Sequence, residues 1–237
     1  MGKWFGARNQ WRGIALLVLA ISSPGCFWQQ KAYTDRMLSE MQNFERRAQL
    51  DRLLGPAFDS NTAEFPLWVR PPKPTQLRAL TEEQKQQNFL GVFQGGDTGG
   101  PLLEFVLIGS AGEESLQEFI QKSFAAMNSA QKGPGTEVPR RDPATVNSMH
   151  GGTTSYEVFS TGGQRQAPGA APVGYQWVYY FTEDSRQKLM LAFIVPDSNY
   201  SAFTNGMQSC LESVALGSKV NYARSGTTAP STGPTGN

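Results

Sequence analysis

The chain has 237 residues, and its 21 Lys and Arg residues nearly balance its 20 Asp and Glu residues, which gives a formal net charge of +1 at pH 7. This balance provides no general attraction for a polyanion, so we expect no nucleic-acid partner. Hydrophobic residues make up 39% of the sequence. That fraction is enough for a packed core, and the length allows one domain with a tail or two small domains.

The N-terminal segment, residues 1–25, has the pattern of a secretory signal peptide. Three basic residues precede an apolar run at residues 14–21, and small or turn-forming residues follow at 22–25. A basic segment, a short apolar segment and a small-residue cleavage site are typical of exported proteins. The apolar run is too short to cross a bilayer, which needs roughly 20 residues. We therefore expect residues 1–25 to be removed.

Cys26 follows Gly25 directly, at the predicted cleavage point. This stretch resembles the lipobox of bacterial lipoproteins, a Leu-small-Gly/Ala-Cys pattern, with Ser23 where Leu is preferred and Pro24 beside it. The resemblance implies cleavage before Cys26 and a lipid such as palmitate on this cysteine. The lipid would anchor the protein to a bacterial cell membrane or outer membrane, facing the periplasm or the exterior. A plain cleaved signal and an uncleaved hydrophobic anchor are the alternatives.

Residues 31–54 predict a charged helix with a narrow apolar stripe. The stripe residues recur at steps of four, three and four along the chain: Met37, Met41, Phe44 and Ala48. Such spacing places them on one side of a helix, which Gly55 and Pro56 would end. We interpret residues 26–54 as a lipid-anchored helical stalk. A short coiled coil and a helix that packs on the domain are the alternatives.

Residues 55–88 are irregular and rich in proline. Four prolines bracket the short apolar segment 67–69: Pro66, Pro71, Pro72 and Pro74. Proline disfavours helices and is confined to edges and turns of sheets. The segment is therefore predicted to be a proline-rich linker with one short extended stretch.

Residues 89–216 have the patterns of a folded domain. Apolar segments at 89–93 and 102–108, separated by a glycine-rich turn, predict a β-hairpin. A broad apolar stripe then predicts a core-facing helix, which ends near Lys132. A polar loop at 140–143 and three strands follow, at 153–160, 174–182 and 188–195.

The last of these strands is apolar on both faces, as expected of a covered central strand. A helix from about residue 197 to residue 215 closes the domain. The fold class is thus α+β, a mostly antiparallel sheet with two packed amphipathic helices, preceded by an N-terminal helix. Residues 217–237 are rich in Ser, Thr, Gly and Pro, and we expect a disordered tail.

The element order from about residue 102 to residue 216 resembles the PsbP-like fold, which includes DcrB-type bacterial lipoproteins. The likeness lies in the strand and helix of 102–127, the turn 149–152 that leads into Tyr156, the strand pair 175–181 and 189–195, and the closing helix. The resemblance implies a small binding or assembly-factor domain without a common catalytic site. No functional residues carry over from it.

An aromatic face on one predicted strand is the candidate binding surface. Its members alternate along the chain: Tyr175, Trp177, Tyr179 and Phe181. They could form a platform for a peptide or a glycan, or they could form core under the helices. We favour the core, because aromatic residues prefer strands and dominate protein interiors.

His150 is the only histidine, and there are only two cysteines. A zinc site typically needs three or four ligands. Cys26 is expected to carry lipid, and Cys210 lies in the apolar stripe of the last helix. We therefore expect no metal and no cofactor. Beside Gly151 and Gly152, His150 is predicted to be a turn or surface residue.

These patterns favour a non-catalytic, membrane-anchored lipoprotein of the cell envelope that acts as a binding or assembly module. Its partners would be the membrane, through Cys26, and a protein of the envelope. The alternative is a hydrolase-like envelope enzyme that uses His150 with a residue the sequence does not reveal. A third hypothesis is a structural component that self-associates through residues 31–54.

Overall fold

The computed structural model describes residues 24–60, 62, 64–96, 103–166 and 171–226. The predicted signal peptide lies almost wholly outside these residues. The chain divides into two compact units, residues 1–49 and 50–237. Among the described helices, none is long and apolar enough to cross a membrane.

Helix α2 (Pro24–Leu53) makes up the described part of the first unit and continues into the second. It confirms the predicted N-terminal helix and begins earlier than expected. The predicted stripe residues Met37, Met41 and Phe44 are exposed by 43%, 56% and 74%. Arg36 and Glu40 form an ion pair one turn apart, at 3.0 Å. Whether α2 acts as a stalk remains a prediction.

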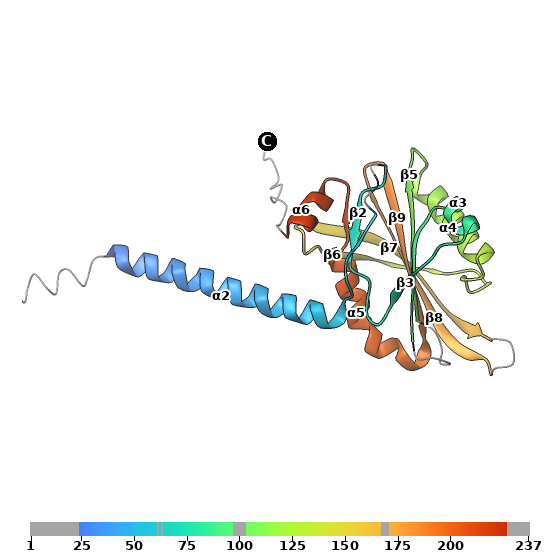
Figure 1. Ribbon diagram of the computed structural model, residues 1–237, viewed down its shortest axis with the longest axis horizontal. Helices are drawn as coiled ribbons and strands as arrows, with labels where there is room; N and C mark the ends of the chain where they lie inside the picture. The colour runs from blue at the N-terminus through green and yellow to red at the C-terminus, as the bar shows by residue number, and fades with distance from the viewer. Residues whose placement is uncertain (1–23, 61, 63, 97–102, 167–170, 227–237) are drawn as a thin grey trace, which may run out of the picture. The chain divides into compact units, whose positions relative to one another are not determined.

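The second unit has an α+β fold, as the sequence predicts, around a seven-stranded sheet in the order β3-β4-β5-β9-β8-β7-β6 (Figure 1). Each neighbouring pair in this sheet is antiparallel. Its strands are β3 (Gln76–Arg78), β4 (Phe89–Gly95), β5 (Leu103–Ala111), β6 (Arg140–Asn147), β7 (Thr153–Arg165), β8 (Val173–Asp184) and β9 (Gln187–Pro196). The remaining elements are β1 (Phe58–Asp59), β2 (Leu67–Val69), α3 (Glu82–Gln86), α4 (Leu116–Ser129), η1 (Asp197–Asn199), α5 (Tyr200–Glu212), β10 (Ala215–Leu216) and α6 (Lys219–Ser225).

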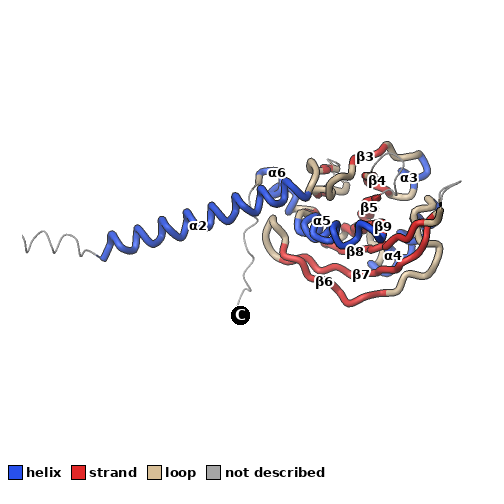
Figure 2. Tube along the Cα trace, turned by 90° about the horizontal axis from the view of Figure 1, so that it is seen from below, coloured by secondary structure: helices blue, strands red, loops and turns tan. Residues whose placement is uncertain are grey.

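Two hydrophobic cores cover the two faces of this sheet. Helix α4 lies on one face and α5 on the other (Figures 1 and 2). Strand β9, in the centre, contributes to both: Leu191 and Phe193 face α5, whereas Met190 and Ala192 face α4. All four are fully buried. The prediction of a central strand that is apolar on both faces is therefore confirmed.

The predicted linker at 55–88 is instead part of the folded unit, so that prediction was wrong. β1, β2 and β10 form a small three-stranded sheet, and β3 extends the large one. Phe65, Leu67 and Val69 are buried in the α5-side core. Prolines disfavour helix but tolerate the ends of short edge strands. Here Pro72 forms an isolated bridge with Leu54.

Two further segments differ from the sequence prediction. The start of the predicted disordered tail forms α6, whose Val220 and Ala223 are buried. Arg224 of this helix forms a bidentate ion pair with Asp59, at 2.6 and 2.7 Å. The predicted polar loop at 140–143 is the beginning of edge strand β6. Pro143 is tolerated there because it lies at an irregularity in the β6–β7 register.

We expect a fragment of residues 50–237 to fold, and a fragment of residues 89–237 to fail. The shorter fragment lacks β1, β2 and β3, together with Phe65, Leu67 and Val69, which complete the α5-side core. Circular dichroism and thermal unfolding of the two purified fragments measure this. A cooperative transition at the same temperature for both would restore the linker interpretation.

Candidate functional site

A cleft opens in the large sheet where β7 and β8 separate. Their register ends at the pair Glu157–Phe181. Beyond it, residues 153–156 of β7 pair with β6, and residues 182–184 of β8 pair with β9. The two strands therefore diverge like a wedge, and the main-chain edge of each faces the gap.

The β6–β7 hairpin contacts the C-terminal end of α5 where it diverges from β8. The last carbonyls of a helix lack partners within it, and a glycine just past the end often supplies a local cap. Residue 213, which follows α5, is a serine in right-handed helical conformation. The Ser213 and Val214 amides donate back to Cys210 and Leu211, and the hairpin adds donors from Met149, His150 and Tyr156.

Three consecutive carbonyls are satisfied in this way. The Tyr156 hydroxyl donates to the Leu211 carbonyl at 3.2 Å, and the Met149 amide donates to the Glu212 carbonyl at 2.9 Å. His150 Nε2 lies 3.2 Å from the Ser213 carbonyl oxygen. These three contacts fix the hairpin to the end of α5.

Gly151 and Gly152 make the hairpin turn that presents His150 to α5. Both have positive φ values, of 100° and 73°. Side chains other than glycine rarely adopt this conformation. The Ser148 hydroxyl accepts a hydrogen bond from the His150 amide, which fixes the backbone at the start of the turn.

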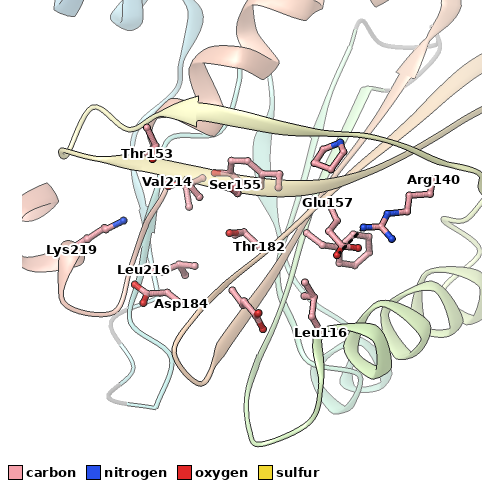
Figure 3. Close-up of a pocket in the computed structure, with 15 residues that line it drawn as sticks. Leu116, Arg140, Thr153, Ser155, Glu157, Thr182, Asp184, Val214, Leu216 and Lys219 are labelled. Carbon is pink, nitrogen blue, oxygen red and sulfur yellow. Dashed lines mark ion pairs between the residues drawn. The ribbon is translucent and has the colours of Figure 1, made fainter. Parts of the chain in front are cut away.

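The cleft has a volume of about 510 Å³, within the range of about 300–1,000 Å³ that is typical of ligand sites. Figure 3 shows the strand that carries Thr153 and Ser155 on one side and Thr182 near the middle. Leu116, at the start of α4, and Lys219, at the start of α6, lie on opposite sides. The lining of the cleft therefore includes residues from the large sheet and from the helices α4 and α6.

Charged side chains of both signs line the cleft. Arg140 and Glu157 form an ion pair at 3.2 Å, both partly exposed. Gln117 donates a further hydrogen bond to Glu157. On the other side, Lys219 and Asp184 line the cleft. This mixed lining favours a polar or zwitterionic ligand over a simple anion or cation.

Thr182 is the most informative residue of the cleft. Thr182 is only 3% exposed as a whole residue, and it lines the cleft. Among the described residues its hydroxyl has no hydrogen-bond partner. Its oxygen is not among the fully enclosed side-chain atoms that lack a partner, so the hydroxyl is open to the cleft. A hydroxyl that is left open toward a cavity is therefore a ready contact for a ligand.

His150 lies in a turn, as predicted, but it is buried at 6% exposure and is not a surface residue. Its ring meets Trp68 edge-on, with ring centroids 4.9 Å apart. Because a carbonyl can only accept, Nε2 is a protonated donor in this contact. Burial lowers the pKa of His150 below its ordinary value. Its role here is structural.

The predicted aromatic face is core, and the platform alternative does not hold in this structure. Tyr175, Trp177, Tyr179 and Phe181 are exposed by 6% or less. They pack under α4, where Phe124 meets both Tyr179 and Phe181 edge-on. Aromatic residues on the inner face of a strand bury more area than smaller residues do.

A buried ion network closes one end of this aromatic core. Lys132 and Arg165 both contact the Glu104 carboxylate, and Arg165 does so at 3.0 Å. The Arg165 guanidinium also lies over the rings of Tyr175 and Trp177. The two cations share one carboxylate, and Arg165 also donates to the main-chain carbonyls of Gln131 and Lys132, so the network fixes the end of the core.

The two cysteines lie in different units. Cys210 is fully buried in the α5-side core, and burial raises the pKa of its thiol, so it is unreactive. Cys26 falls within α2, and its side chain lies outside the described residues. Its lipidation remains a prediction. In the described part of the chain, no three His, Cys, Asp or Glu side chains gather in a way that would bind a metal ion.

The comparisons with known proteins are distant. No family model and no curated protein match the sequence. A crystal structure from Bacteroides thetaiotaomicron is similar at a TM-score of 0.39 and 10% identity, over 70% of this chain and 49% of that chain. LpqN, described as involved in cell envelope biogenesis of Mycobacterium tuberculosis, is similar at 0.40 and 11% identity, over 68% of this chain and 89% of that chain.

This chain spans about half the length of the Bacteroides protein. At these scores and identities, neither likeness carries an argument about function. Because no family model matches, the resemblance to the PsbP-like fold stays a prediction.

We expect the free energy of unfolding to fall as the pH falls from about 7 toward about 5. The folded state lowers the pKa of His150 from 6.5, so the unfolded chain takes up this proton at a higher pH. Between the two pKa values the unfolded state binds more protons, and acidification costs stability; below the lower one the loss levels off. Urea unfolding across this range measures the effect.

The control for this prediction is His150→Gln, which retains an N–H donor for Ser213 but does not titrate. Its free energy of unfolding should change less with pH over the same range. Glu114, whose pKa is lowered from 4.5 by Lys122 and Ser110, responds only at lower pH. Equal slopes in both proteins would assign the pH dependence to other groups.

Tyr156→Phe is expected to lower the free energy of unfolding by about 0.5–1.5 kcal/mol, the net value of one hydrogen bond. The substitution removes the donor to Leu211 and keeps the ring. The matched control is Tyr180→Phe, because the Tyr180 hydroxyl has no hydrogen-bond partner among the described residues. An equal effect of the two substitutions in urea unfolding would exclude the proposed capping of α5.

Proposed function

We propose that this protein is a non-catalytic binding or assembly module of the bacterial cell envelope, tethered to a membrane by a lipid on Cys26. The cleft between β7 and β8 is the observation that carries the binding role. It combines a ligand-sized volume with the open Thr182 hydroxyl and charges of both signs. The pattern of residues 1–26 supports export and anchoring.

The described lining of the cleft contains no histidine that could serve as a general base. A nucleophile needs a general base within hydrogen-bond reach. His150 is absent from the cleft lining, because it is engaged with Ser213 beneath Trp68. Glu157, a carboxylate in the cleft, is occupied by Arg140 and Gln117. The hydroxyls of Thr153, Ser155 and Thr182 therefore have no histidine beside them in the described lining.

Helix α2 suits a tether between the lipid and the folded unit. It has 30 residues, and at 1.5 Å per residue a helix of this length extends about 45 Å. Acyl chains would provide the membrane affinity, at about 0.8 kcal/mol for each buried methylene. In this proposal the anchor fixes the location of the module, and the cleft selects its partner.

Metabolic labelling tests the anchor. Expressed in a bacterial host with an alkyne-tagged palmitate, the wild-type chain should carry the label and sediment with membranes. Cys26→Ala should lose the label and leave the membrane fraction, because the sulfur that accepts the lipid is missing. Gel fluorescence after fractionation measures both.

Cys210→Ala is the matched control, since Cys210 is fully buried and should not accept lipid. Label that persists in Cys26→Ala, or its absence from the wild type, would contradict the lipoprotein proposal. Hydrolysis of a panel of ester and amide substrates that is lost on substitution of Thr182 would contradict the non-catalytic part.

A further inference from the structure

We infer that the cleft receives an extended peptide segment of a partner protein, which enters the sheet between β7 and β8 as an added strand. This inference rests on the proposed binding function and names the class of ligand. Three features of the cleft support it: the interrupted pairing of the two strands, the open hydroxyl of Thr182 and the polar lining.

Main-chain groups along the gap are available to pair with a further strand. Where β7 and β8 diverge, residues 153–156 and 182–184 each pair with a strand on one side only. The edge of a strand presents unpaired N–H and C=O groups, which are a template for another strand. In strand addition such groups provide affinity, and pockets for alternate side chains provide specificity.

The geometry also constrains the peptide's direction. β7 and β8 are antiparallel to each other, so a strand between them runs antiparallel to one and parallel to the other. The gap begins at the Glu157–Phe181 pair, where there is no room for a third strand. The inserted segment is therefore short.

The side chains on the two sides of the cleft could contact alternate residues of an inserted strand. Successive residues of a strand point to opposite faces of its sheet. Toward α4 the cleft offers Leu116 and the Arg140–Glu157 pair, and on the opposite side it offers Leu216 and Lys219. An inserted peptide would direct alternate side chains into these two environments. Each one combines an apolar contact with a charge.

Other ligand classes fit this lining less well. Glycans are recognised by stacking on exposed aromatic rings, but the two aromatic residues in the lining, Tyr156 and Phe181, are exposed by 1% and 0%. An acyl chain needs an apolar tunnel, whereas Arg140, Glu183, Asp184 and Lys219 line this cleft. A peptide main chain matches both the hydroxyl of Thr182 and the strand edges.

Selection from an mRNA-displayed library of random octapeptides against the full chain, purified in mild detergent, tests the inference. The selected peptides are then measured by fluorescence anisotropy. Thr182→Val keeps the branched shape and removes the hydroxyl, so we expect about 3- to 10-fold weaker binding, the effect of one hydrogen bond. Thr145→Val is the matched control, because Thr145 is exposed on β6 outside the cleft.

A scan of N-methylated peptides tests strand pairing directly. Methylation removes one main-chain donor at a time and leaves every side chain in place. Losses of about tenfold or more at central positions, one hydrogen bond plus a steric clash, would support an added strand. Equal binding of every methylated peptide, equal binding by Thr182→Val, or no selected peptide at all would overturn the inference.

Amide chemical shifts separate failure of this inference from failure of the proposed function. If no peptide binds but fragments of cell-wall glycan shift the amides of residues 153–156 and 182–184, the cleft is a binding site for another class and the peptide is excluded. If neither probe shifts them, both the peptide and the binding role of the cleft fail. The lipid label reports on the anchor in either case.

Discussion

The capping of α5 by the β6–β7 hairpin is the interaction on which the shape of the cleft depends. A helix end that is buried without partners is costly, because each unpaired carbonyl loses its contacts with water. Here no glycine follows α5 directly, and Tyr156, Met149 and His150 supply the donors. These contacts hold the hairpin on α5 where it diverges from β8. The cleft lies in the gap between the two strands.

The contact between His150 and the Ser213 carbonyl links the protonation of one buried histidine to the position of the hairpin beside the cleft. His150 can donate to Ser213 while it is neutral, in a site formed by Trp68 and the end of α5. A second proton on the ring would place a charge in this buried site, where little compensates it. The same contact therefore supports the stability of the hairpin and the position of one wall of the cleft.

Sequence patterns predicted the parts of the fold that depend on periodicity. The double-sided apolar run of β9 and the alternating aromatic residues of β8 indicated a central sheet, because their burial follows directly from strand geometry. Proline content was misleading at residues 55–88, since composition does not show that Phe65 and Leu67 find a core. The sequence did not reveal the cleft. Thr182 and Thr153 line it from two different strands that diverge in space, and no local sequence pattern marks that divergence.

A gap in the strand pairing of a sheet exposes strand edges to unwanted association, and the surrounding residues reduce this risk. Open strand edges invite association with identical chains, and natural proteins protect them with charges. Arg140, Glu183, Asp184 and Lys219 surround this gap, and in a second copy of the chain they would have to be desolvated. The charges account for the exclusion of unwanted strands, whereas the Thr182 hydroxyl opens to the cleft without a partner among the described residues. In the proposed binding role, Thr182 is therefore the residue that a ligand would contact.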